Sequence, residues 1–163
     1  MPGRGFRRRA LRTLALFAAF VLTAGAIATP TSASPAMWSG VYRSDDFVVQ
    51  SVMMSVSGSR VTLKSLQTYV RCTEVSTGQI SPKAVWIVDY PQAAVLRANR
   101  FTFDFALQSN TLGPLVDYRI TGALNPGGQG RVRVAMEGNE VDGDTGEVLS
   151  RCTGGVTFQV RRR

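Results

Sequence analysis

The chain has 163 residues, a formal net charge of +8 and no histidine. The lack of histidine excludes the usual general base of hydrolases and the commonest zinc ligand. Eight of the 19 basic residues lie in two clusters, five before residue 13 and three at 161–163, which leaves 11 basic residues against 11 acidic ones. The rest of the chain is therefore neutral, and we expect no nucleic-acid partner, although the basic end at 161–163 could contact anionic polymers.

The first 33 residues have the pattern of a secretory signal peptide. Arginines precede an apolar run at 14–27, which is shorter than the roughly 20 residues that a membrane-spanning helix needs. Cleavage is expected after Ala33, with Ala28 as the alternative. We therefore predict a signal peptide at 1–33 and a secreted domain at 34–163 that is extracellular, monomeric and not attached to a membrane.

Alternating apolar and polar residues dominate the rest of the chain and predict an all-β fold. The number of short strands favours a single antiparallel β-sandwich or barrel of about eight strands. A change of phase near 64–66 predicts a β-bulge, and Gly154 with Gly155 predicts a break in the last strand. The expected strands are 41–43, 47–56, 60–70, 83–90, 101–108, 116–121, 131–136 and 148–160.

The strands between residues 101 and 136 form a predicted meander whose register follows from the apolar faces. Pairing Phe105 with Tyr118 places Asp104 opposite Arg119. The same reasoning at the next hairpin places Arg119 opposite Glu137. We therefore expect an outward row of acid, base and acid across three strands.

The only two cysteines, Cys72 and Cys152, predict an intramolecular disulfide. Disulfides persist in oxidising compartments, so this prediction agrees with the signal peptide. Cys152 shares its phase with the apolar residues of the last strand, so the bond is expected to tie that strand to an earlier one. A reactive or intermolecular thiol is the alternative.

An acidic, glycine-rich segment at 137–147 could bind calcium. Glu140, Asp142, Asp144 and Glu147 supply carboxylate oxygens, and two of them alternate as the early ligands of a calcium loop do. The twelfth position from Asp142 is Thr153, where such a loop requires a bidentate glutamate. A plain acidic hairpin loop is the alternative, and no other cofactor is predicted.

Three aromatic residues, Trp38, Trp86 and Tyr90, are candidate platforms for a sugar ring. Such a role requires at least one ring exposed to water, and the alternative is that these rings belong to the core.

The chain lacks the sequence motifs of nucleophilic and nucleotide-dependent enzymes. A hydrolase would need two carboxylates in one cleft, as in a glycosidase or lyase. The candidates for such a pair are Asp45, Asp46, Asp89, Asp104 and Asp117. A secreted protease inhibitor, with Leu112 to Leu115 as its exposed loop, is a further alternative.

Two sets of landmarks resemble small secreted actinobacterial β-proteins with two cysteines. The first set is Trp38, Gly40 and Tyr42, and the second is the segment from Cys152 to Phe158, which follows one mid-chain cysteine. The resemblance implies an antiparallel β domain bridged once. We therefore expect a non-catalytic binding or surface-interaction module for an extracellular or cell-wall ligand, with the glycosidase or lyase and the inhibitor as alternatives.

Overall fold

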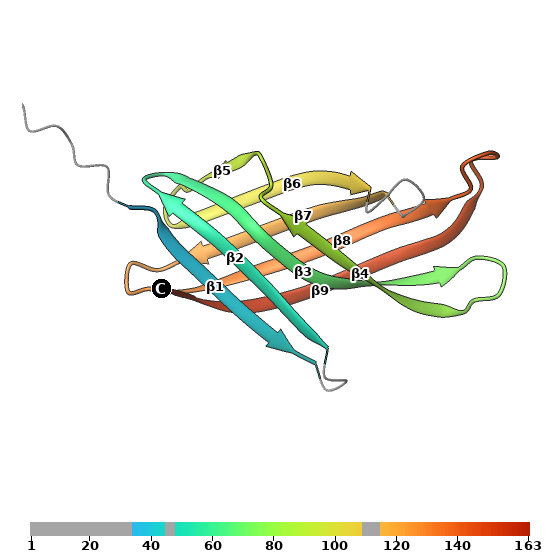
Figure 1. Cartoon of the computed structure of the whole chain (residues 1–163), viewed down its shortest axis with the longest axis horizontal. Helices are drawn as coiled ribbons and strands as arrows, with labels where there is room; N and C mark the ends of the chain where they lie inside the picture. Colours follow the sequence, from blue (N-terminus) through green and yellow to red (C-terminus); the bar gives the residue numbers. More distant parts are fainter. Residues whose placement is uncertain (1–33, 45–47, 109–114) are drawn as a thin grey trace, which may run out of the picture. The chain divides into compact units, whose positions relative to one another are not determined.

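The computed structural model describes residues 34–44, 48–108 and 115–163, so the predicted signal peptide lies outside the described residues. The regular secondary structure of the described residues consists of strands (Figure 1). These strands are β1 (Ala36–Arg43), β2 (Val49–Ser57), β3 (Arg60–Glu74), β4 (Ile80–Val88), β5 (Ala93–Val95), β6 (Arg100–Gln108), β7 (Leu115–Leu124), β8 (Gln129–Val141) and β9 (Val148–Arg162). Within this part of the chain there is no helix long and apolar enough to cross a membrane.

The strands form one antiparallel sheet in the order β4-β3-β2-β1-β9-β8-β7-β6, with β5 paired to β3. A further pairing of β3 with β9 closes β1, β2, β3 and β9 into a four-strand barrel. The predicted all-β antiparallel class is therefore confirmed. The sequence analysis left open a sandwich or a barrel, and these four strands form a barrel. The other strands extend the same sheet.

Two long strands make this closure possible. One end of β3 pairs with β2 through residues 60–67, and its other end pairs with β9 through residues 71–74. Similarly, β9 pairs with β3 near its start and with β1 at residues 161–162. Figure 1 shows β1 and β2 crossing β8 and β9 at an angle, so β9 meets its neighbours on this side only near its two ends.

The core lies between the inward faces of these strands and follows their alternation. Phe158 at its centre has no exposed surface. Tyr90, Phe105 and Tyr118 form a stack in which successive ring centroids are 4.1 and 5.1 Å apart. The phase change near residue 64 is a β-bulge, as predicted, because Met53 pairs with Ser65 while Met54 pairs with Leu63.

The predicted register holds at the first hairpin of the meander and is wrong at the second. Asp104 faces Arg119, and the Oδ1–Nε distance is 2.7 Å. Arg119, however, faces Ala135, and Glu137 faces Asp117. The observed turn between β7 and β8 is centred on residue 127, and the Asn125 N–H donates to the Gln129 carbonyl at its start. The predicted register requires a turn centred on residue 128, one residue later.

The predicted break in the last strand is also wrong. Gly154 and Gly155 are continuous with β9 and keep their pairing with β8. What changes at these residues is the neighbour on the opposite edge, because the ladder with β3 ends at Thr153.

Candidate functional site

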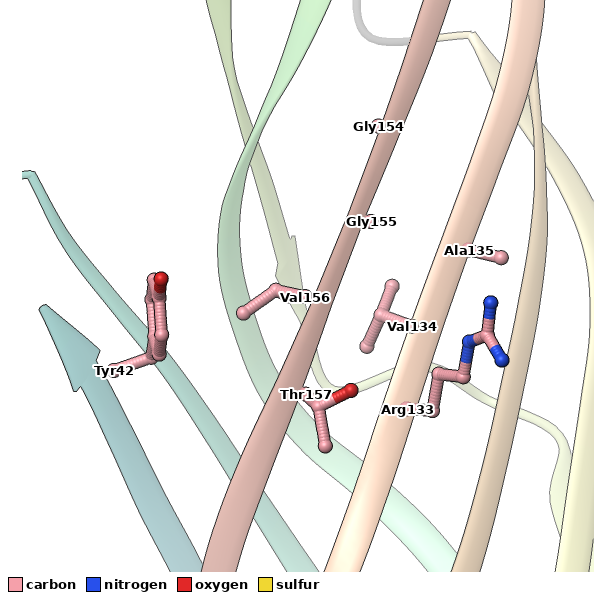
Figure 2. Close-up of a pocket in the computed structure, with 8 residues that line it drawn as sticks. All are labelled: Tyr42, Arg133, Val134, Ala135, Gly154, Gly155, Val156 and Thr157. Carbon is pink, nitrogen blue, oxygen red and sulfur yellow. The ribbon is translucent and has the colours of Figure 1, made fainter. Parts of the chain in front are cut away.

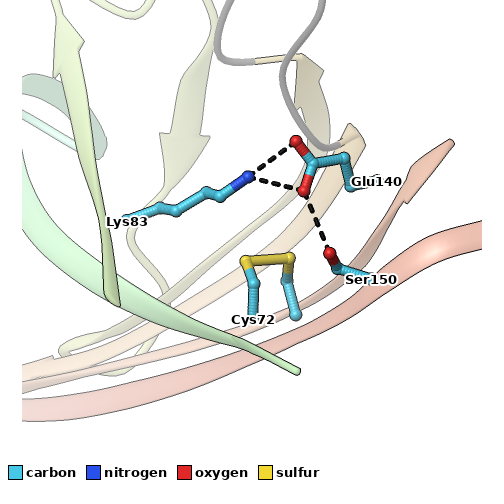
Figure 3. Close-up of polar contacts among 5 residues, drawn as sticks. Cys72, Lys83, Glu140 and Ser150 are labelled. Carbon is cyan, nitrogen blue, oxygen red and sulfur yellow. Dashed lines mark hydrogen bonds and ion pairs between the residues drawn. A yellow bond between two sulfur atoms is a disulfide. The ribbon is translucent and has the colours of Figure 1, made fainter. Parts of the chain in front are cut away.

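Cys72 and Cys152 form the predicted disulfide, with a Cα–Cα distance of 3.9 Å (Figure 3). They occupy directly opposite positions on β3 and β9, and both are buried. This bond holds β9 against β3 just before the two strands separate.

Beyond that point, a groove opens between β9, β3 and the β1–β2 hairpin. Residues 154–160 of β9 are paired with β8 on one edge, and the first pairing with β1 on the other edge is at Arg161. The larger part of the groove has a volume of about 830 Å³, and a smaller part of about 470 Å³ shares Tyr42, Gly154 and Gly155 with it. We call these two parts the β9 groove. The larger part is lined by Tyr42, Ser44, Val48, Gln50, Tyr69, Arg71, Ile80, Pro82, Thr153, Gly154 and Gly155.

Backbone groups of β9 point into this groove. The odd-numbered residues of β9 direct their backbone groups toward β3 and β1: the carbonyl of Leu149 accepts a hydrogen bond from Val75, directly after β3, and the N–H of Arg163 donates to β1. The even-numbered residues face the other edge, since the N–H of Arg162 donates to the carbonyl of Gly128 in the β7–β8 turn. Successive residues of a strand direct their N–H and C=O groups to opposite edges. The N–H and C=O groups of Gly155 and Thr157 therefore face the groove, where the described residues provide no strand pairing.

Two glycines shape the floor of the groove. A Cβ atom on Gly154 would lie 2.9 Å from the Tyr69 carbonyl oxygen and 2.8 Å from Met136 Cε, so only glycine lets β9 pass this close to β3. Gly155 points outward and is exposed. Figure 2 shows Tyr42 on the far side of the opening from both glycines. The sequence analysis predicted a strand break at Gly154 and Gly155, whereas in the structure the two glycines lie within β9 and line the groove.

The side chains along the groove are aromatic, apolar and cationic. Tyr42 is 42% exposed and Ile80 is 63% exposed, and Arg71 contributes a positive charge. No carboxylate is present among the described residues that line the groove. Asp45 and Asp46 lie outside the described residues.

The three predicted sugar-stacking aromatics do not form one site. Trp38 and Tyr90 are 6% and 8% exposed and belong to the core, so neither can stack on a ligand at the surface. Trp86 is 70% exposed on β4, beside the equally exposed Val88. These positions correct the prediction for Trp38 and Tyr90, because Trp38 lies on the inward face of β1 and Tyr90, between β4 and β5, stacks on Phe105.

The acidic segment forms a structured hairpin turn. Asp142 Oδ1 accepts hydrogen bonds from the N–H groups of Asp144 and Thr145, at 2.9 and 2.8 Å, and from the Thr145 hydroxyl. These bonds, chiefly the one from the Thr145 N–H, lower the pKa of Asp142. Glu147 is exposed after the turn.

The predicted calcium ligands Glu140, Asp142, Asp144 and Glu147 are thus not gathered around a common point. Within the described residues, no group of three acidic or sulfur-bearing side chains could hold a metal ion. The hairpin alternative describes this segment, because Asp142 is occupied by the turn and Glu140 by a basic partner.

Glu140 belongs to a polar cluster beside the disulfide, as Figure 3 shows. Lys83 Nζ lies 2.6 Å from Glu140 Oε1, and the Ser150 hydroxyl donates to Glu140 Oε2 at 3.1 Å. Glu140 on β8 and Ser150 on β9 are paired residues of neighbouring strands, whereas Lys83 lies on β4, which pairs with neither, so the ion pair joins strands that are not neighbours in the sheet. The hydrogen bond from Lys83 is the main cause that lowers the pKa of Glu140.

Replacing Glu140 by glutamine is expected to lower the free energy of unfolding by about 1 kcal/mol at pH 7. The folded protein holds the pKa of Glu140 below the unfolded value of 4.5, so this stabilisation is present above pH 4.5 and is lost as the pH falls through the lowered pKa. Urea unfolding of wild type and Glu140→Gln from pH 7 to pH 3 should give curves that converge at low pH. A constant difference over this range would contradict the assigned ion pair.

The candidate catalytic carboxylates are placed apart or paired with bases. Asp104 pairs with Arg119, and Asp89 lies 3.0 Å from Lys64 Nζ. Asp117 is exposed on the outer face of β7. For the inhibitor alternative, residues 112–114 lie outside the described residues, and Leu115 is exposed at the start of β7.

Comparison with protein-family models, with curated proteins and with solved structures gave no match to this chain. The resemblance to secreted actinobacterial β-proteins therefore stays a prediction.

Proposed function

We propose that this protein is an exported, non-catalytic binding module that takes an extended peptide segment of an extracellular partner into the β9 groove. The observation that carries the proposal is the edge of β9 at Gly155 and Thr157, whose backbone groups face the groove without a strand partner. An exposed strand edge pairs readily with an extended peptide, and pockets beside it select alternate side chains.

The groove's side chains support a peptide over a small polar substrate. Tyr42, Val48 and Ile80 offer apolar surface for side chains of the bound segment, and Arg71 offers a charge for an acidic one. A glycosidase or lyase would require two carboxylates on the groove, and none of the described lining residues supplies one.

Two features support export. The first 33 residues have the composition of a signal peptide, and the disulfide belongs to an oxidising compartment. The ligand is therefore expected on the outside of the cell or in its wall, and the module acts as a monomer.

Thr157→Pro tests the proposed edge pairing directly. Proline removes the N–H that faces the groove and leaves intact the bonds of β9 to β8, which its even-numbered residues make. Thr157→Ala removes the hydroxyl and methyl groups of the side chain and keeps the N–H, so it separates the loss of the side chain from the loss of the donor. Peptides selected from a phage-displayed random library on residues 34–163 should bind wild type and Thr157→Ala alike, and should bind Thr157→Pro at least about tenfold more weakly.

The melting temperatures of both variants serve as the control for folding. The proposal would be wrong if the library yields no peptide above background, or if the selected peptides bind Thr157→Pro as well as wild type. Binding to a neutral glycan array that Tyr42→Ala abolishes, with no peptide binding, would assign the groove to sugars instead.

A further inference from the structure

A second hollow lies on the outer face of β6, β7 and β8, and it meets the smaller part of the β9 groove at Arg133. It has a volume of about 370 Å³, and arginines stand on both of its sides. We call its outward-facing residues the arginine trough. They are Arg100, Thr102, Thr121, Ala123, Arg131 and Arg133.

Strand pairing explains the shape of the trough. Arg100 on β6 and Arg131 on β8 both lie opposite Ala123, the small residue of β7 between them. One step along the sheet, Thr121 lies between Thr102 and Arg133. With strands about 4.8 Å apart, Arg100 and Arg131 are about 10 Å apart across β7, and only the short side chain of Ala123 lies between them.

The trough arginines carry uncompensated charge. Each is exposed, and none forms an ion pair within the described part of the chain. The neighbouring Arg119 differs, because Asp104 neutralises it. The acidic turn of the β8–β9 hairpin lies toward the other end of β8, and even Glu137 is about 20 Å along the strand from Arg131.

The arginines at 161–163 lie at this same end of the sheet. Arg161 pairs with Gln129, two residues before Arg131, and Arg163 N–H donates to the Met37 carbonyl at 2.8 Å. This basic segment is therefore held by β9 and its neighbours, and it extends the positive surface of the trough.

We infer that the arginine trough binds an extracellular linear polysaccharide or wall polymer through its phosphate or sulfate groups. Guanidinium groups bind such oxyanions with two parallel hydrogen bonds, and the hydroxyls of Thr102 and Thr121 can donate further ones. Donors on both sides of an open hollow, continued by the arginines at 161–163, suit a chain of several anions better than one small ion. The trough shares Arg133 with the smaller part of the β9 groove, whereas Arg100 and Arg131 line the trough alone, so a variant at these two positions tests the trough by itself.

Replacing Arg100 and Arg131 together by glutamine (Arg100→Gln with Arg131→Gln) tests the inference, because these two exposed residues line the trough and not the β9 groove. The probes are poly(glycerol phosphate) and heparin, which carry phosphate and sulfate respectively, with neutral dextran as a blank. Whichever of the two polymers binds wild type more tightly should bind the double variant at least about tenfold more weakly. Raising the salt concentration should weaken wild-type binding. Arg100→Lys with Arg131→Lys should recover only part of the affinity, because lysine restores the charge without the planar guanidinium group.

The matched control is Arg60→Gln with Arg151→Gln, which removes the same net charge from exposed positions outside the trough. The control should bind within about twofold of wild type, and unchanged melting temperatures show that both variants fold. Equal weakening in both double variants, binding to neither polymer, or tighter binding to single-stranded DNA than to both polymers would overturn the inference. Peptide binding in the β9 groove is measured separately and does not depend on this result.

Discussion

Replacing Cys72 and Cys152 together by alanine is expected to lower the free energy of unfolding by about 4–5 kcal/mol. The bond joins residues 80 positions apart, so its loss releases a long loop in the unfolded chain. It is also the covalent link between β3 and β9 at the place where β9 turns away from β3. The measurement is urea unfolding of residues 34–163, followed by the fluorescence of the buried Trp38.

The same experiment in wild type with and without a reducing agent supplies the control for the substitutions. Reduced wild type should unfold at the same urea concentration as the double alanine variant. If the free energy of unfolding falls by less than about 1 kcal/mol, the prediction is wrong, and the β3–β9 pairing is stable without the disulfide.

Phe158→Ala is expected to destabilise the domain by about 3–5 kcal/mol. Its ring is fully buried on the inward face of β9, opposite Val132 on β8. Gly40 lies close by, because a Cβ atom there would be 3.2 Å from Phe158 Cβ. Residues 154–160 of β9 pair with β8 on one edge and with no strand on the other, so core packing contributes much of what holds them in place. The cavity left by the Phe158 ring should therefore weaken the closure of the barrel.

Phe158→Leu and Thr157→Ala are the matched controls for this variant. The first keeps most of the buried volume and should cost less than half as much, and the second changes an exposed neighbour and should stay within about 0.5 kcal/mol of wild type. Chemical denaturation at one pH compares all four proteins. Equal losses for Phe158→Ala and Thr157→Ala would place the core elsewhere.

Local patterns predicted the interior of this fold well because they report on single strands. Alternation in 101–108 and in the last strand identified faces that the structure buries, and the phase change near residue 64 identified the bulge. Trp38 and Tyr90 were predicted as sugar platforms with a core position as the alternative, and the structure places both in the core. The pairing of Asp104 with Arg119 also followed, because the two positions are fixed by one hairpin.

The candidate sites were less predictable because they depend on how strands from distant parts of the chain meet. The arginines of the trough on β6 and β8 are 31 or more positions apart in the sequence. The predicted register between β7 and β8 differs from the observed one, so it would place other residues of β7 next to Arg131 and Arg133. The β9 groove exists because β9 exchanges one neighbour for another, and no residue pattern within a single strand encodes that exchange.

An all-β domain with one disulfide and with apolar faces of known phase follows from the sequence, because side-chain alternation and the count of two cysteines are properties of the chain. The pairing of β3 with β9, the position of Gly154 and Gly155 on the floor of a groove and the shared face of three arginines are known from the folded structure alone. The physical reason is that strand order and register across long connections are set by packing the whole core at once, and the exposed edges and charged rows follow from that packing.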